Sequence, residues 1–344
     1  MEERLKVSKE FSNKILSWMR GRGEIIIIVH DNPDPDCLAS ALALSHLFLT
    51  KLGQKSVIAL SGMIGRSENI AMARGLQIGL TPLSIINFKE FKTVCMLDTQ
   101  PMTGNNSLPQ DVTVDIVIDH HPLREATKMC KWVDVRENYG ATSTIVYEYL
   151  LAQDIKITTK IATALFYAIK SETQDLGREA NHPDKTAYLH LFPLTNKKLL
   201  YQITNPRQPM EYYRTIRRTL DNARIYDSVM VANMGKIAFP EVVAEMADFL
   251  LHLEGMDSVL CTGEYNNSII ISLRTMKEDF NAGDALRRIV DVKGVAGGHG
   301  MMAGGKIDLP TNSESAISEA EKFITTRFLE ETDSIDAEPK SFSD

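Results

Sequence analysis

Residues 25–44 read IIIIVHDNPDPDCLASALAL, and this stretch predicts both the architecture of the chain and the place of its site. The apolar run at its start is long enough for a buried strand, and the Leu- and Ala-rich run after the second proline indicates a helix. His30, Asp34 and Asp36 therefore lie in a loop at the carboxyl end of a strand, which is where open α/β sheets bind their ligands. Imidazole and carboxylate groups are ligands suited to Mn²⁺ or Mg²⁺. The alternative is a plain turn in which the aspartates only cap the helix.

Two later apolar runs end on residues of the same kind. Asp98 follows the first of these runs directly, and the triplet Asp119-His120-His121 follows the second, which ends at residue 118. A single aspartate in such a place is commonly a cap or a strand end, but two adjacent histidines after a core strand are hard to explain by packing. Because parallel strands of one sheet end at the same edge, these charged groups are expected to converge there, and the sequence predicts a metal site.

The composition indicates a globular protein with two domains. The chain has 344 residues, of which 44% are hydrophobic and 24% charged, and its net charge is −7. The negative charge argues against a protein that coats long nucleic-acid duplexes through a basic surface. The four cysteines show no CxxC spacing, which argues against a zinc ribbon or a redox dithiol. Without a signal-peptide pattern or a long apolar span, the sequence predicts a soluble, cytoplasmic protein with no membrane partner.

The pattern of apolar runs divides the chain into four segments. We expect an α/β architecture, in which an N-terminal parallel-sheet domain with helices on both faces is followed by a smaller C-terminal α/β domain. The expected bounds are 1–200 for the first domain, 201–226 for a helical connector, 227–329 for the second domain and 330–344 for an acidic, disordered tail.

Two polar segments outside the main motifs are further candidates for a site. Residues 170–178 carry two carboxylates, Glu172 and Asp175, after a predicted helix. Residues 294–305 hold six glycines around His299, a composition that lets backbone amides approach a ligand closely. The alternative for the glycine-rich segment is a flexible turn.

These motifs together resemble those of the DHH phosphoesterase superfamily, which combines a DHH domain with a DHH-associated C-terminal domain. The matching segments are H-x-x-P-D-x-D at residues 30–36, Asp98, the triplet at 119–121 and the glycine-rich residues 297–299. The length and two-domain layout are most similar to the branch of oligoribonucleases (nanoRNases), pAp phosphatases and linear or cyclic dinucleotide phosphodiesterases. Exopolyphosphatases and inorganic pyrophosphatases are more distant members.

The resemblance implies two divalent cations in the cleft between the domains, where they activate a water molecule. Mn²⁺ is the preferred ion and Mg²⁺ is the alternative. It implies the following ligands: His30, Asp34 and Asp98 for the first cation, and Asp36, Asp98, His120 and either Glu172 or Asp175 for the second. The last ligand is open because a glutamate stands where the family usually has an aspartate. Alignment with the family motif favours Glu172.

The resemblance also implies how the substrate is held. His121 would donate a hydrogen bond to a phosphoryl oxygen, and the 5′-phosphate end would be held by residues of the second domain, namely Arg274, Gly297, Gly298 and His299. A site that holds the end of a chain restricts the enzyme to short substrates.

The function implied by the resemblance is a metal-dependent phosphoesterase for short oligonucleotides or linear dinucleotides, with nucleoside bisphosphates such as pAp or cyclic dinucleotides as further substrates. One alternative is a phosphomonoesterase or a polyphosphate or pyrophosphate hydrolase with the same metal chemistry. Another is a non-catalytic nucleotide-binding module, for which the glutamate in the fourth motif is the only support. The sequence leaves the oligomeric state open, a homodimer included.

Overall fold

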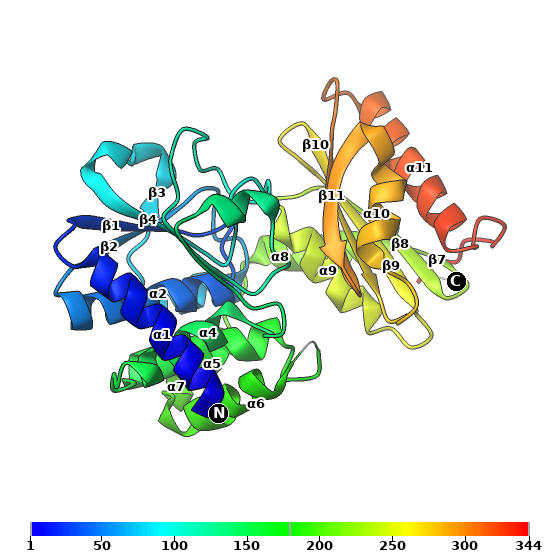
Figure 1. The fold of residues 1–344 in the computed structure, drawn as a ribbon. Coiled ribbons are helices and arrows are strands. Elements are labelled where there is room, and N and C mark those ends of the chain that lie inside the picture. The colour runs from blue at the N-terminus through cyan, green and yellow to red at the C-terminus, as the bar shows by residue number, and fades with distance from the viewer. Residues whose placement is uncertain (1, 179, 343–344) are drawn as a thin grey trace. The chain divides into compact units, whose positions relative to one another are not determined.

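The structure is a computed structural model, and it describes residues 2–178 and 180–342. The chain divides into two compact units, Met1–Pro206 and Arg207–Asp344, each with its own sheet and its own hydrophobic core (Figure 1). Among the described residues, no helix has the length and apolar character needed to cross a membrane.

The sheet of the first unit is parallel throughout. Its strands are β1 (Glu24–Ile28), β2 (Ser56–Leu60), β3 (Thr81–Pro82), β4 (Phe91–Leu97), β5 (Ile116–Asp119) and β6 (Trp132–Val135). In space their order is β3-β2-β1-β4-β5-β6, so the chain runs from β1 to one edge and then returns to continue on the other side. The direction reverses between β1 and β4, and the carboxyl ends of strands at such a point form a ligand-binding crevice in this class of fold.

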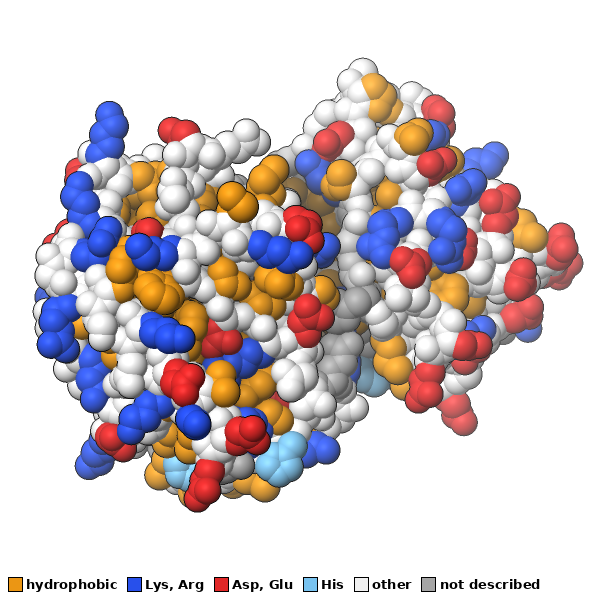
Figure 2. Space-filling model, in the orientation of Figure 1, with side chains coloured by type: hydrophobic (Ala, Val, Ile, Leu, Met, Phe, Trp, Pro, Cys, Tyr) orange, Lys and Arg blue, Asp and Glu red, His pale blue; other side chains and the backbone are white. Residues whose placement is uncertain are grey.

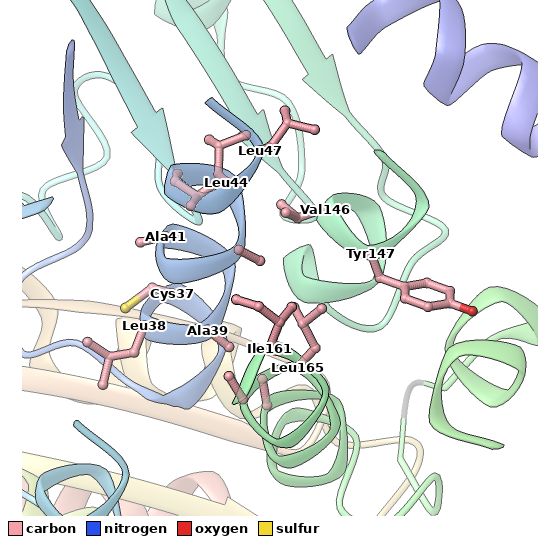
Figure 3. Packing of buried hydrophobic residues seen from close by; sticks show 14 of the residues in the cluster. Cys37, Leu38, Ala39, Ala41, Leu44, Leu47, Val146, Tyr147, Ile161 and Leu165 are labelled. Atoms are coloured by element: carbon pink, nitrogen blue, oxygen red, sulfur yellow. The ribbon is translucent and has the colours of Figure 1, made fainter. Parts of the chain in front are cut away.

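The core of the first unit lies between the sheet and its α-helices. These helices are α1 (Glu2–Met19), α2 (Pro35–Leu52), α3 (Ser67–Gly75), α4 (Thr142–Ala152), α5 (Thr159–Glu172), α6 (His182–Leu191) and α7 (Lys197–Thr204). Because side chains alternate across a strand, Ile25 and Ile27 of β1 face these helices, whereas Ile26 and Ile28 face the other way. Helix α2 runs through the middle of this core, beside α4 and α5 (Figure 3).

The other face of this sheet, toward which Ile26 and Ile28 point, is covered by fewer helices than the sequence analysis predicted. Where we expected helices on both faces, this face is covered by the short 3₁₀ helices η1 (Leu83–Ile85) and η2 (Phe88–Glu90) and by loop residues such as Leu108 and Val112. The connection from β4 to β5 contains Pro, Gly and Asn in close succession, and these residues favour turns over helix. A further 3₁₀ helix, η3 (Glu125–Met129), precedes β6, and η4 (Phe192–Leu194) follows α6.

The second unit is a mixed sheet with helices on both faces. Its strands are β7 (Arg224–Tyr226), β8 (Val229–Lys236), β9 (Ser258–Tyr265), β10 (Ser268–Thr275), β11 (Gly294–His299) and β12 (Met302–Asp308), in the order β11-β12-β10-β9-β8-β7. Its helices are α8 (Met210–Asn222), α9 (Glu241–Leu251), α10 (Ala282–Val290), the 3₁₀ turn η5 (Asp291–Lys293) and α11 (Glu314–Glu331). Helices α10 and α11 share one core with the sheet, and α8 and α9 share another on the opposite face.

Two segments of this unit differ from the sequence-based expectation. Residues 294–305, expected as a loop, form the hairpin of β11 and β12. Glycine permits this pairing: Gly298 has a φ of +150°, and a Cβ there would meet the Met302 carbonyl oxygen at 2.3 Å.

The acidic tail was expected to be disordered, but part of it pairs with the edge strand β7. Ile225 and Lys340 exchange two backbone hydrogen bonds, of 2.8 and 2.9 Å, and Ser334 is buried. Hydrogen bonds to a strand edge hold this segment although its composition is that of a disordered tail.

Candidate metal centre

The charged motif residues follow three strands that are neighbours in the first sheet. His30 lies two residues beyond β1, Asp98 directly follows β4, and His120 and His121 directly follow β5. All three strands are parallel, so these side chains meet at one edge of the sheet, at the point where the strand order reverses.

One half of the cluster is built around His30. Its Nδ1 lies 2.9 Å from the carbonyl oxygen of Asp31, which can only accept a hydrogen bond, so Nδ1 carries a proton. Its Nε2 is 3.5 Å from Oδ2 of Asp34 and 3.8 Å from Oδ2 of Asp98. Burial opposes a charge on His30, but the neighbouring Cys37 and Asp34 raise its pKa well above the ordinary value. The imidazole therefore faces a region of negative charge that favours a cation.

The other half is built around His120. Its Nδ1 lies 3.2 Å from the carbonyl oxygen of Tyr139, which again fixes the proton on Nδ1. Its Nε2 is 3.7 Å from Oδ1 of Asp98 and 4.0 Å from Oδ2 of Asp36. This nitrogen is buried and has no hydrogen-bond partner among the described residues. Metal-binding histidines show this arrangement, in which the second ring nitrogen is held by a backbone carbonyl.

Asp98 is shared by both halves of the cluster. It is 2% exposed and accepts a 2.7 Å hydrogen bond from the hydroxyl of Thr142. Burial, and then the charges of Asp36 and Asp34, raise the pKa of Asp98 well above its ordinary value. Its φ of +59° is an unfavourable backbone conformation for a residue with a side chain. A buried carboxylate in such surroundings indicates a site shaped for positive charge.

Asp34 and Asp36 also accept hydrogen bonds from backbone amides at the starts of helices. The capping role that the sequence analysis gave as the alternative is therefore present as well. Oδ1 of Asp34 caps α2 by accepting hydrogen bonds from the backbone of Asp36 and Cys37, at 2.9 and 3.0 Å. The carboxylate of Asp36 accepts from the backbone of Thr142 and Ser143, at 2.7 and 2.8 Å. In Asp34 the other oxygen, Oδ2, remains directed to His30. Capping thus orients these carboxylates toward the cluster.

The two candidates of the fourth motif differ in burial and in partners. Burial and the charge of Asp34 raise the pKa of Glu172 to about 7, whereas His120 lowers it, so this carboxylate lies within electrostatic reach of the cluster. Asp175 is exposed and accepts hydrogen bonds from Tyr188, at 2.8 Å, and from Lys170. Glu172 is thus half-buried and within the electrostatic influence of the cluster, whereas Asp175 lies at the surface.

Two polar residues fix His121: Asp119, the first residue of the triplet, and Gln100, which the sequence analysis did not assign to the site. Oδ1 of Asp119 accepts a 2.8 Å hydrogen bond from Nδ1 of His121, so Nε2 is the nitrogen left to meet a ligand. Oδ2 of Asp119 accepts a 2.7 Å hydrogen bond from Gln100, which is 1% exposed. Gln100 also accepts from the backbone of Arg124 and the hydroxyl of Thr127, each at 2.8 Å. The only feature of the sequence that could have indicated Gln100 is its place two positions after Asp98.

The residues expected to hold the substrate lie in the second unit. Arg274 pairs with Met302 across β10 and β12, and Ser272 pairs with Gly304, which in turn pairs with Gly297 on β11. Cross-strand partners share a face, so these residues lie on one side of the sheet. A Cβ on Gly297 would meet nothing within 4 Å, so the backbone is bare there. The backbone of His299 lies at the end of β11, and its side chain lies outside what the structure describes.

Arg274 is buried and held in place. Its Nε donates to Oδ1 of Asp248 at 2.5 Å, and one of its terminal nitrogens donates to the hydroxyl of Ser272 at 2.9 Å. The guanidinium is thus held against the backbone of β12, where a terminal nitrogen also donates to the carbonyl oxygen of Ala303 at 3.4 Å.

Comparison with known proteins agrees with this arrangement. Residues 24–169 match the DHH family, N-terminal domain, and residues 227–326 match the DHHA1 domain. The chain is 34% identical over 290 residues to an uncharacterised protein of Methanocaldococcus jannaschii; the match covers 84% of this chain and 59% of that protein. The chain thus spans less than two thirds of that relative.

Two further similarities concern a shorter stretch and the fold. A probable manganese-dependent inorganic pyrophosphatase of Lactobacillus delbrueckii subsp. bulgaricus is 26% identical over 149 residues, which is 43% of this chain and 47% of that protein. The crystal structure of an exopolyphosphatase-related protein from Bacteroides fragilis superposes with a TM-score of 0.72 at 15% identity, covering 94% of this chain and 98% of that one. The second similarity shows that the two share a fold.

Proposed function

This chain belongs to the DHH family, and from that premise we propose that it is a phosphoesterase that uses divalent cations to hydrolyse short oligonucleotides or linear dinucleotides. The observation that carries the proposal is Nε2 of His120, which is buried, lacks a hydrogen-bond partner among the described residues and faces Asp36 and Asp98. A buried polar atom without a partner is costly, and so are several buried carboxylates close together. Cations at this edge of the sheet offset both costs.

We propose two cation positions that share Asp98. His30, Asp34 and Asp98 would hold the first, and Asp36, Asp98, His120 and Glu172 would hold the second. Two ligands that each lie about 2.1 Å from a cation are about 3.0–4.2 Å apart, and the nitrogen–oxygen separations of 3.5–4.0 Å fall in that range. Bound there, such ions lower the pKa of water and neutralise charge on a phosphoryl group. The similarity to a relative named as manganese-dependent supports Mn²⁺, with Mg²⁺ as the other candidate.

His121 is the residue that we expect to act on the substrate directly. Its side chain is 40% exposed, and Asp119 fixes its proton on Nδ1. Burial works against the charged form, but the hydrogen bond to Asp119 prevails and raises the pKa of His121 above its ordinary value. The imidazolium can therefore donate a proton from Nε2 to a phosphoryl or leaving-group oxygen near neutral pH.

The second unit supports a substrate with a phosphate-bearing end. A fixed guanidinium next to bare backbone suits a phosphate, which Arg binds through parallel hydrogen bonds and which bare amides can approach. On the face that Figure 2 shows, basic and acidic side chains are interspersed, which suits a small anionic substrate better than a long duplex. The free cysteines are typical of proteins in a reducing compartment and support a cytoplasmic site of action.

Pyrophosphate or polyphosphate hydrolysis is the second candidate. The similarity to the pyrophosphatase favours it, but that similarity covers only 43% of this chain. A panel of 5′-phosphorylated dinucleotides, a five-nucleotide RNA, pAp, a cyclic dinucleotide and pyrophosphate, each with Mn²⁺ and with EDTA, separates the candidates. We expect release of mononucleotides from dinucleotides that stops with EDTA. Faster hydrolysis of pyrophosphate than of any nucleotide would replace the proposed substrate, and hydrolysis at the full rate in EDTA would exclude the metal centre.

Arg274→Ala tests how the end of the substrate is held. Loss of a charge-assisted hydrogen bond to phosphate costs about 1.5–3 kcal/mol, which is roughly a ten- to hundred-fold loss of kcat/KM. The loss should appear on a 5′-phosphorylated dinucleotide and not on bis(p-nitrophenyl) phosphate, which has no such end. Asp248→Asn is the control, because it removes the charge that holds Arg274 and leaves the guanidinium in the protein. An equal loss on both substrates would mean that Arg274 serves only the fold.

A further inference from the structure

We propose that the thiol of Cys37 is an additional ligand at the first cation position, which would make that position selective for softer divalent ions such as Co²⁺, Zn²⁺ or Fe²⁺. The inference rests on the proposed function, because that function supplies the cation. The resemblance described above implies only imidazole and carboxylate ligands there.

The position of Cys37 relative to the other three ligands is the first support. His30, Asp34, Cys37 and Asp98 each offer one ligand atom, and these four atoms all lie within 4.8 Å of one another. Four ligands at 2.0–2.3 Å around one tetrahedral cation are about 3.3–3.8 Å apart. The separations of His30 Nε2 from Asp34 and Asp98, at 3.5 and 3.8 Å, already have this size. The sulfur therefore completes a four-ligand set with small movements.

The surroundings of Cys37 are the second support. It lies in the first turn of α2, after the cap Asp34, and is fully buried. Figure 3 shows its sulfur on the side of α2 opposite Ile161 and Leu165 of the aliphatic core. Its hydrogen bond, 3.4 Å to the carbonyl oxygen of Asp34, is the weak kind that a thiol makes.

The other cysteines provide the comparison. Like Cys37, Cys95 and Cys261 are fully buried members of hydrophobic cores, but they belong to no candidate group of metal ligands in the described part of the chain. Cys37 is thus the cysteine whose burial places it against the charged cluster.

Coordination changes the chemistry of this thiol. Burial raises the pKa of Cys37, and the neighbouring His30 opposes this. A coordinated thiol is deprotonated, so the bond from sulfur to the cation forms as the thiol proton leaves to solvent. Thiolate is a soft ligand that selects against Mg²⁺, whereas the second position offers only imidazole and carboxylates, which Mg²⁺ and Mn²⁺ accept. The two positions would then differ in the metal they prefer.

Cobalt is the probe for this proposal, because a thiolate bound to Co²⁺ adds a sulfur-to-metal charge-transfer absorption in the near ultraviolet. The full-length protein is stripped of metal and titrated with Co²⁺, with bound Co²⁺ measured by equilibrium dialysis. The comparison is between Cys37→Ala and the matched variant Cys95→Ala, which makes the same change at an equally buried position. A Cys130→Ser background removes the partly exposed thiol.

We expect the absorption in the wild type and in Cys95→Ala, and its loss in Cys37→Ala together with a fall in Co²⁺ affinity of about tenfold or more. Affinity for Mg²⁺ should change much less. Bound Co²⁺ without the absorption in the wild type, or with equal absorption in Cys37→Ala, would overturn the assignment of Cys37 and leave the proposed function standing. A wild type that binds Mn²⁺ but no Co²⁺ would overturn only the assignment of Cys37, and a wild type that binds neither ion would overturn both. If Cys37→Ala does not fold, Cys37→Ser takes its place, and the spectrum of the wild type in the Cys130→Ser background still decides.

Discussion

Glu172 and Asp175 lie three residues apart and differ in burial, since Glu172 is half-buried and Asp175 is exposed. Helix α5 ends at Glu172, and Gln174, Asp175 and Leu176 then all take positive φ angles, a tight left-handed turn that carries Asp175 outward. We expect Glu172→Gln to lower kcat/KM by at least about 100-fold and to weaken Mn²⁺ binding, because it removes a charged ligand without changing the shape. Asp175→Asn should stay within about threefold of the wild type, since it loses only an exposed ion pair. Steady-state kinetics and Mn²⁺ titration of both variants check this, and the reverse order would move the ligand to Asp175.

The metal-free protein should lose stability as the pH rises. Burial and Asp34 raise the pKa of Glu172 to about 7. The contribution of Glu172 to the free energy of unfolding is therefore complete below the ordinary pKa of 4.5 and is lost as the pH rises through 7. The melting temperature of the metal-free chain should therefore fall between pH 5 and pH 8, and Mn²⁺ should reverse most of the fall at pH 8. In Glu172→Gln the fall should be smaller. A melting temperature that rises over this range would contradict the assignment.

The residues of the site were predictable from the sequence where they follow apolar strands directly. His30, Asp98 and His120 stand out because a polar group at the end of a buried strand has few structural reasons to be there. Gln100 and Asp184 could not be predicted in this way. Their importance comes from hydrogen bonds to residues 19 to 44 positions away, and only the folded chain brings those partners together.

At the scale of elements, helix α6 stabilises the turn that carries two partners of the candidate metal ligands. The buried carboxylate of Asp184 accepts hydrogen bonds from the backbone of Gly140 at 2.9 Å and from the hydroxyl of Thr144 at 2.6 Å. Tyr139, whose carbonyl holds His120, directly precedes Gly140, and Thr142, whose hydroxyl holds Asp98, lies between Gly140 and Thr144. We therefore expect Asp184 to act as a positioning residue for the proposed second cation position.

Asp184→Asn should destabilise the protein by about 1–3 kcal/mol, since it leaves a buried donor without its partner, and should weaken binding of the second Mn²⁺ by about tenfold. Calorimetric Mn²⁺ titration alongside thermal unfolding measures both effects. Asn196→Ala is the control, because it removes the cap of α7, which is worth about 0.5–2 kcal/mol, and so lowers stability without touching the turn. If both variants bind Mn²⁺ equally well, Asp184 contributes to the fold only.

The elements themselves were predictable to different degrees. Strands β1, β4 and β5 follow from apolar β-branched runs, and α2 follows from its prolines and its Leu and Ala pattern. Strand β3 has two residues and β6 is half-buried, so neither leaves an apolar run in the sequence. The hairpin of β11 and β12 was hidden by its glycines, which usually indicate a turn and here permit two backbones to approach.

At the scale of the molecule, the chain forms two units with separate cores, and our proposal assigns the chemistry to the first and the choice of substrate to the second. Because the cluster from His30 to Glu172 lies within the first unit, residues 1–206 alone should unfold cooperatively and bind Mn²⁺ with an affinity within about threefold of the full chain. They should hydrolyse bis(p-nitrophenyl) phosphate and lose at least about tenfold on a 5′-phosphorylated dinucleotide. Calorimetry and kinetics on the two proteins test this. If residues 1–206 fold but do not bind Mn²⁺, the second unit contributes a ligand.

The C-terminal segment has a consequence for how the protein behaves at high concentration. Strand β7 is the last strand on its side of the second sheet, and an unpaired strand edge is a template for aggregation with other chains. The backbone of Lys340 occupies part of that edge by pairing with Ile225. Two molecules that meet along β7 must first displace their own C-terminal segments, which are always present at high local concentration. We therefore expect the segment to reduce association between molecules along β7.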